Sequence, residues 1–267
     1  MKKYWSFFRM RLIAGLQYRT AAWAGISTQA VWGLLYVLLY RSLYLSAPEL
    51  LPMDMQALCS YVWIQQALFS VWNPYAWENE LFSAVQTGTV AYELLRPADL
   101  YVMWTVRTLA LRLSRGALRL APIVILGLLL PAPYGLRLTI GPAACGAFLL
   151  AFLLTLYLCG CLTMLCYGLT FYVTDSRGII SIFAALSEFF SGGALPLPFF
   201  PPLLRRIAEL SPFGSLQNVP LRIFGGDIAG GDILPALALQ VFWCVVLTAA
   251  GYALLRRGLR RTVIAGG

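Results

Sequence analysis

The sequence predicts an all-helical integral membrane protein with six transmembrane helices, in a single permease-like domain over residues 1–267. Composition is the first reason: 60% of the residues are hydrophobic, only 12% are charged, and the mean hydropathy is +0.75. A soluble domain carries about 25% charged residues. The second reason is that several apolar runs approach the roughly 20 residues that cross a bilayer. The third is that charged residues collect between these runs, and no segment is left over for a soluble domain.

Six apolar runs are assigned as spans, at residues 21–44, 55–75, 105–130, 142–172, 179–195 and 233–255. The third begins near Thr105, because Leu120 to Leu130 alone is too short to cross about 30 Å of hydrocarbon. This layout places fifteen of the twenty Lys and Arg residues on the cytosolic side. Such a bias follows the positive-inside rule, so both termini are expected in the cytosol.

Residues 1–20 are basic and rich in aromatic side chains. Trp5, Phe8, Leu12 and Leu16 recur on one helical face, a pattern typical of an interfacial helix on the cytoplasmic leaflet. The alternative is a basic, disordered N-terminus that charge alone keeps in the cytosol.

The longest polar segment away from the termini lies between the second and third spans, at residues 77–101. Glu78 and Glu80 favour the start of a helix, since the positive end of the helix dipole stabilises acidic side chains. Pro97 disfavours helical backbone at Arg96, so the helix is expected to end at about that residue. A rigid helix there can pass motion between the spans and a partner, so we interpret it as a cytosolic coupling helix. Its candidate docking residues are Glu78, Glu80, Gln86, Thr87, Glu93, Leu94, Arg96 and Pro97.

Charged side chains inside the predicted spans are candidates for a transport pathway. Arg112, Arg115 and Arg119 share one narrow face of the third span. One interpretation is an inward vestibule that attracts anionic substrates; the other is that these side chains extend to lipid phosphates. Glu188 is the single acid deep in a span. It can relay protons or bind a cation, or it can simply hydrogen-bond across the bundle or face a wet cavity.

Two aromatic residues follow Glu188 directly, and we include them among the candidate pathway residues. They are Phe189 and Phe190. Aromatic rings at this depth can stack against a planar or amphipathic substrate, but they also serve as core or interface anchors.

Residues 196–226 contain repeated helix breakers and two apolar pieces, Leu203 to Leu210 and Phe213 to Phe224, each too short to span. Pro212 biases Ser211 away from helix and so separates the pieces. We expect two re-entrant helices in the outer leaflet, because broken backbone at membrane depth needs protein or water around it. The candidate residues of an outer gate are Pro201, Leu203, Leu204, Pro212 and Phe213.

Several kinds of chemistry lack the residues that they require. A nucleotide-binding loop needs a Lys after a glycine-rich turn, yet the only lysines are Lys2 and Lys3, so any ATP must be hydrolysed by another chain. His is absent, and the six Cys lie in apolar stretches without a second pair at ligand spacing, so neither a metal nor a resident cofactor is expected. The net charge of +9 flanks the spans, so topology explains it better than nucleic-acid binding.

Two segments and the overall layout are distinctive. The segments are YELLRPADLY after the second span and SGGALPLPFFPPLLRRIAELSPFGSLQNVPLRIFGG before the last. Together with six spans and a basic N-terminal helix, they resemble the permease subunits of type-2 ABC exporters, most closely the viologen-exporter-like branch. The resemblance covers essentially the whole chain.

The resemblance implies a half-transporter in the cytoplasmic (inner) membrane of a bacterium. Two permeases, either two copies or this chain and a related one, would pair among the membrane lipids. Two cytosolic ATPase subunits would bind ATP and Mg²⁺ and dock on residues 77–101. The outer re-entrant helices would close the extracellular gate. The cargo would be a small amphipathic, drug-like or lipid-like molecule moved out of the cytoplasm.

Two other functions stay open from the residues alone. An ion-coupled secondary transporter centred on Glu188 would be favoured by internal inverted repeats. A membrane-embedded lipid-modifying enzyme would need clustered acids, His or a metal site near the membrane face. Neither feature is evident in the sequence, so we expect a permease subunit that is not itself an enzyme.

Overall fold

The computed structural model describes residues 2–47, 49, 53–138, 140–173 and 175–260. Within these ranges every regular element is a helix, in agreement with the predicted fold class. The elements in chain order are α1 (Lys2–Leu16), α2 (Arg19–Ser46), α3 (Met55–Trp72), α4 (Asn79–Gln86), α5 (Val90–Leu94), α6 (Leu100–Leu129), α7 (Pro142–Thr170), α8 (Arg177–Phe190), η2 (Leu197–Phe199), α9 (Pro202–Leu210), α10 (Asn218–Gly225), η3 (Gly230–Asp232) and α11 (Ile233–Leu259).

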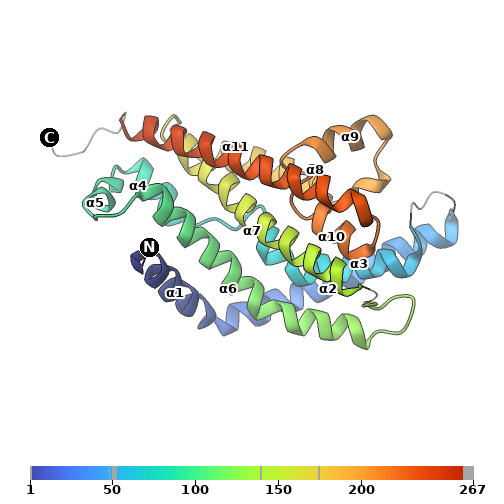
Figure 1. Cartoon of the computed structure of the whole chain (residues 1–267). Coiled ribbons are helices and arrows are strands. Elements are labelled where there is room, and N and C mark those ends of the chain that lie inside the picture. Colours follow the sequence, from blue (N-terminus) through green and yellow to red (C-terminus); the bar gives the residue numbers. More distant parts are fainter. Residues whose placement is uncertain (1, 48, 50–52, 139, 174, 261–267) are drawn as a thin grey trace.

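The long helices run lengthwise between two ends of the molecule (Figure 1). One end holds the start of α1, the C-terminal end of α11 and the short helices α4 and α5; we call it the terminal end. The opposite end holds α9, α10 and the C-terminal ends of α2 and α6; we call it the distal end. Residues 77–101 therefore lie at the same end as the start of α1 and the C-terminal end of α11.

Helix α3 forms the centre of the bundle. Fifteen of its 18 residues are buried, and it packs against α2, α6 and α10. The Asp54 carboxylate caps its start by accepting a hydrogen bond from the Ala57 backbone nitrogen at 2.6 Å. The fully buried Trp63 joins α3 to the α6–α7 connection, because its indole donates to the Tyr134 carbonyl at 2.9 Å.

Helix α1 lies along α6. The two approach closely at Gly15, where a Cβ atom would lie 2.2 Å from the Ser114 hydroxyl. No residue of α1 is fully buried; Trp5 stacks on Phe8 with ring centroids 5.6 Å apart. A helix over these residues matches the expected N-terminal helix, and its place on the lipid leaflet stays a prediction.

Three helices in the described part of the chain are both long and apolar enough to cross a membrane. They are α2, α7 and the stretch Gly230–Leu259 that contains α11. Helices α3 and α6 have 18 and 30 residues, but their polar side chains keep them out of this set. The count of six spans stays a prediction.

The expected start of the third span near Thr105 is wrong. Helix α6 begins five residues earlier, at Leu100. The reason is a cap that the hydropathy pattern does not show: the Asp99 carboxylate accepts a hydrogen bond from the Val102 backbone nitrogen at 3.0 Å.

The fifth predicted span, residues 179–195, also differs. Helix α8 ends at Phe190, and its 14 residues rise only about 21 Å, which is shorter than the roughly 30 Å of hydrocarbon. The chain leaves the helix through Gly192, whose φ of 82° is readily adopted only by glycine.

Residues 77–101 fold as two short helices, not as the one helix expected up to Arg96. Helix α4 ends at Gln86, and α5 begins at Val90. Gly88 between them has a φ of 75°, a conformation that breaks the helix and turns the chain. The second of these helices, α5, ends at Leu94, close to the helix end expected at about Arg96.

Residues 196–226 contain η2 and two α-helices, and the α-helices are separated at Ser211, whose ψ of 159° is extended as Pro212 predicts. The expected start of the second piece at Phe213 is wrong, because residues 212–217 form turns and α10 begins only at Asn218. Helix α9 is mostly exposed, whereas α10 packs against α7 and buries six of its eight residues.

Candidate functional site

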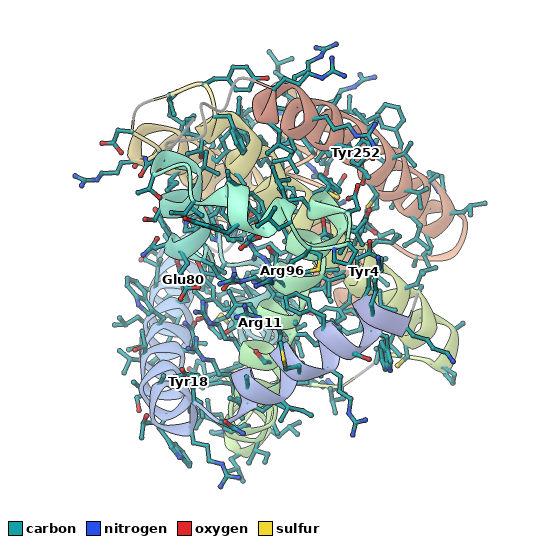
Figure 2. All side chains as sticks on the ribbon, turned by 90° about the vertical axis from the view of Figure 1, so that its left-hand side faces the viewer. Tyr4, Arg11, Tyr18, Glu80, Arg96 and Tyr252 are labelled. Atoms are coloured by element: carbon teal, nitrogen blue, oxygen red, sulfur yellow. The ribbon has the colours of Figure 1, made fainter. Side chains whose placement is uncertain are left out.

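The segment 77–101 presents a short exposed surface at the terminal end. We call it the exposed tip; it consists of Tyr92, Leu94, Leu95, Arg96 and Pro97, all of them exposed. Leu95 and Tyr92 are 81% and 73% exposed. Figure 2 looks onto this end and shows Arg96 near its centre.

Short contacts fix the tip to the bundle. The Trp104 indole of α6 donates to the Glu93 carboxylate of α5 at 2.5 Å. The Lys3 ammonium of α1 donates to the Pro97 carbonyl. Glu93, predicted as a docking residue, therefore faces inward and orients its exposed neighbours.

A second group of contacts holds the residue that follows the tip. The Asp99 backbone nitrogen donates to the Tyr4 hydroxyl of α1 at 3.0 Å. The Tyr252 hydroxyl of α11 donates to the Asp99 carboxylate at 3.4 Å. In Figure 2, Tyr4 lies to the right of Arg96, and Tyr252 lies above and to the right of it. The tip is thus tied to α1, α6 and α11 at once.

The start of the segment is also anchored. Arg107 of α6 pairs with Glu78 at 2.6 Å and with Glu80, and the Glu78 backbone nitrogen donates to the Tyr167 hydroxyl at 3.0 Å. The Glu78 side chain is only 15% exposed, but that of Glu80 is 81% exposed. Of these two predicted docking residues, only Glu80 faces outward.

The two predicted docking residues at the end of α4 are exposed. The Gln86 amide donates a hydrogen bond to the Ser176 hydroxyl at 3.4 Å, and the Thr87 hydroxyl donates to the Ser83 carbonyl at 2.8 Å. Tyr92 and Leu95 were missing from the predicted set. A signal for them existed in the sequence, because they are large apolar residues inside the most polar segment between two spans.

The structure separates the three arginines expected on one face. Arg112 is 2% exposed, and its side chain hydrogen-bonds to neighbouring helices. It donates to the Val71 and Asn73 carbonyls at the end of α3, at 2.6 and 3.1 Å, and to the Thr163 hydroxyl of α7 at 3.0 Å. Arg112 is therefore absent from the cavity that Arg115 and Arg119 line, and the vestibule stays a prediction.

Arg115 and Arg119 line a cavity of about 510 Å³ between α1, α2, α4 and α6. Its walls include small and apolar residues of all but α4. Its charged lining residues are Arg11, Glu78, Glu80, Arg107, Arg115 and Arg119. We call it the arginine cavity.

Glu188 lies away from the arginine cavity, at the end of α8. A Cβ atom at Gly193 would lie 2.8 Å from the Glu188 carboxylate and 2.9 Å from the Gln217 amide nitrogen. The Gln217 amide also donates to Ser191 at 2.9 Å. Glu188 thus belongs to a polar cluster at the turn that follows α8.

The two phenylalanines after Glu188 pack toward the chain that leads into α9. Phe189 is 45% exposed and lies 5.0 Å from the Phe200 ring, centroid to centroid. Phe190 packs against the small cluster of Leu197, Phe200 and Ala208.

The five predicted gate residues are not brought together. Pro201 and Leu203 are exposed, and Leu204 packs on the small cluster beneath α9. Pro212 is half-buried, and Phe213 packs on the main core. The outer gate therefore stays a prediction, and its candidate residues do not form a single cluster: Leu204 and Phe213 pack in two different clusters.

The described residues contain no group of three Cys, Asp or Glu side chains placed to hold a metal ion. The six cysteines are free thiols, all buried except the half-buried Cys145.

The all-helical architecture of the described residues and their long apolar helices agree with what a comparison with protein families found. No curated protein matches the chain. A family model described as ABC-2 family transporter protein matches residues 25–266, which is nearly the whole chain. The chain therefore belongs to the ABC-2 transporter family, and it is the membrane component of an ABC transporter.

Proposed function

We propose that this chain is one half of the membrane part of an ATP-driven exporter. Two such halves, identical or related, pair in the cytoplasmic membrane of a bacterium with their termini in the cytosol. Two separate ATPase subunits carry ATP and Mg²⁺ and dock on residues 77–101. The exported molecule is small and amphipathic, of the drug-like or lipid-like kind that the viologen-exporter-like branch suggests.

The exposed tip is the observation that supports this proposal most directly. The large apolar side chains of Tyr92 and Leu95 are costly to leave in water, and exposed apolar patches mark protein interaction sites. Arg96 beside them adds a cationic group. Tyr and Arg are also the residue types enriched where binding energy concentrates. The tip lies at the end that holds the start of α1 and the C-terminal end of α11, which is the cytosolic end under the positive-inside rule.

The anchoring of the segment suggests how a docked partner moves the membrane helices. Trp104 and Arg107 tie both ends of the segment to α6. Phe82 of α4 packs on Tyr167 of α7, with ring centroids 4.7 Å apart. A displacement of the tip therefore acts on α6 and α7 together, because close-packed interfaces transmit strain.

The test replaces exposed residues and leaves the anchors intact. The double variant Leu95→Asp/Arg96→Glu is expected to lose at least about tenfold in affinity for the ATPase subunit, because a contact of this kind contributes more than 1 kcal/mol. The measurement is co-purification of the ATPase from native membranes, followed by substrate-stimulated ATP hydrolysis in vesicles.

The matched control is Leu138→Asp/Arg137→Glu, the same substitutions at two adjacent exposed residues of the connection between α6 and α7, outside the predicted gate. This control should keep the ATPase bound and stimulated. Unchanged hydrolysis in the tip variant, or equal loss in both variants, would count against docking at the tip.

A further inference from the structure

We propose that the arginine cavity binds the phosphate of an anionic phospholipid from the adjacent leaflet. This site does not depend on the proposed export function, since the evidence for it is the chemistry of the cavity walls.

The charge of the cavity is unbalanced. Four arginines face two glutamates around it, a surplus of two positive charges. Arg107 is the ion-pair partner of both glutamates. Arg11, Arg115 and Arg119 make no ion pair with any described residue, so three guanidinium groups are available to an anion.

Two of these arginines have buried donors without a partner. The Nε atoms of Arg11 and Arg119 are inaccessible and make no hydrogen bond within the described chain. An unsatisfied buried donor on a charged group is destabilising. A phosphate in the cavity would not reach these Nε atoms, but its oxygens accept the terminal N–H groups of guanidinium in bidentate fashion and stabilise the buried charge.

The backbone makes room for this arrangement. Gly25 of α2 lies against the Arg119 guanidinium, where a Cβ atom would come within 2.2 Å of Cζ. The close approach holds the Arg119 head at the wall between α2 and α6. Arg11 approaches from α1, with its guanidinium 5.4 Å from the Phe7 ring centroid.

The size and the remaining lining fit an amphiphile better than a bare ion. The volume of about 510 Å³ lies within the range of small-molecule sites, roughly 300–1,000 Å³. Ala21, Ala22, Leu111 and Leu118 give the cavity an apolar side next to the arginines. A headgroup fits the charged side, and the glycerol and first methylenes fit the apolar side.

Exposed aromatic residues near the cavity favour lipid as the source of the phosphate. Tyr18 at its rim is 71% exposed, and Trp23 on α2 and Trp5 on α1 are each 66% exposed. Trp and Tyr of this kind concentrate at the depth of lipid headgroups. Figure 2 looks onto the terminal end. In that view Arg11 lies at a height between Glu80 and Tyr18 and to the right of both.

The experiment compares lipids on the purified chain in an uncharged detergent. Native mass spectrometry is used to titrate dioleoyl phosphatidylglycerol and dioleoyl phosphatidylcholine. We expect the phosphatidylglycerol to bind at least about tenfold more tightly. In Arg115→Gln/Arg119→Gln that preference should fall by about tenfold or more, the loss expected for hydrogen bonds to charged groups.

The matched control is Arg9→Gln/Arg206→Gln, which removes two exposed arginines outside the cavity and keeps the same net charge change. It should retain the preference within about a factor of two, the size expected for surface substitutions. If the double variant does not fold, Arg115→Gln alone serves, because Arg115 is exposed.

Three results would overturn the proposal. One is equal affinity for both lipids, and another is equal loss in the cavity and control variants. The third is displacement of phosphatidylglycerol by sn-glycerol 1-phosphate at comparable concentrations, which would make a soluble phosphate ester the ligand in place of lipid.

Discussion

The Trp104 indole donates a hydrogen bond to the Glu93 carboxylate over 2.5 Å, and this bond joins α6 to α5. Trp104 is 1% exposed and packs in the same core cluster as Leu81, Phe82 and Val85 of α4. One residue of α6 therefore contacts the core beneath α4 and orients α5. The exposed tip owes its fixed position to this arrangement.

Replacing Trp104 by Phe should loosen the tip without unfolding the bundle. The ring remains, but the hydrogen bond to a charged acceptor is lost, at a cost of about 1.5–3 kcal/mol. Amide hydrogen exchange over residues 90–96 should accelerate by about tenfold or more, because local opening governs exchange there. Trp77→Phe is the control, since the Trp77 indole nitrogen has no partner among the described residues. Equal acceleration in both variants would show that the bond does not hold the tip.

Arg112→Gln should destabilise the whole bundle. Arg112 satisfies the Val71 and Asn73 carbonyls and the Thr163 hydroxyl, so its loss leaves buried acceptors unpaired. The expected cost is about 3 kcal/mol. For a chain of this size that lowers the apparent melting temperature by about 6–12 °C in detergent.

The control for that variant is Arg115→Gln, three residues along the same helix. Arg115 is exposed, so its replacement should change stability by no more than about 0.5 kcal/mol. A similar fall in both would mean that Arg112 acts through general charge and not through its hydrogen bonds.

Gly214→Ala should disturb the connection between α9 and α10. A Cβ atom at Gly214 would lie 2.1 Å from the Ala208 carbonyl oxygen, and backbone cannot rotate out of the way as a side chain can. Overpacking of this kind costs about 1–3 kcal/mol, which a thermal melt in detergent detects. Gly225→Ala is the control, because its Cβ atom would meet open space. A normal melting temperature for Gly214→Ala would contradict the packing at this turn.

The fold class was predictable because it depends on composition summed over many residues. Long helices follow from apolar runs, and the break at Ser211 follows from the ring of Pro212. Helix boundaries depend on single local contacts instead. The Asp99 cap that starts α6 at Leu100 and the positive φ of Gly88 between α4 and α5 are examples.

The candidate site was predictable as a segment but not residue by residue. A charge in a polar segment looks exposed in sequence, yet Glu78 and Glu93 face inward because Arg107 and Trp104 meet them from α6. The partner residues are 29 and 11 positions away, and no local pattern indicates such pairings. The same applies to Arg112, whose acceptors lie on α3, on the turn after it and on α7.

Glu188→Gln should leave ATP-driven transport intact. Gln keeps the size and a hydrogen-bonding carbonyl but cannot titrate, and Glu188 lies in a polar cluster with Gln217 beside the turn at Gly193. The measurement is uptake into inside-out vesicles with ATP, with and without an imposed pH gradient. If transport by the parent protein depends on the pH gradient and transport by the variant does not, the result supports proton coupling through Glu188 and contradicts a purely structural role.

The last prediction concerns which side of the membrane each end of the bundle faces. Arg222 of α10 pairs with Glu209 of α9 at 2.5 Å, so the two helices are linked at the distal end. Most basic residues lie toward the terminal end in the predicted topology, which places the distal end outside the cell. Asn218 is 2% exposed, so it is a poor labelling position although it lies within the predicted re-entrant region 196–226. Leu203 on α9 and Tyr92 on the tip are 75% and 73% exposed and make a matched pair.

In a Cys-free background, Leu203→Cys should react with a membrane-impermeant maleimide added to intact cells. Tyr92→Cys should react only in inside-out vesicles. If the distal end seals the pathway, the Leu203→Cys rate should also change when the ATPase is trapped with ATP, because closing or opening the seal moves α9, which carries Ala208, against Leu197 and Phe200. Labelling of both positions from one side would contradict the topology. If the labelling rate of Leu203→Cys does not change with nucleotide, the topology stands but the gate hypothesis fails, because a surface that never moves cannot open a path.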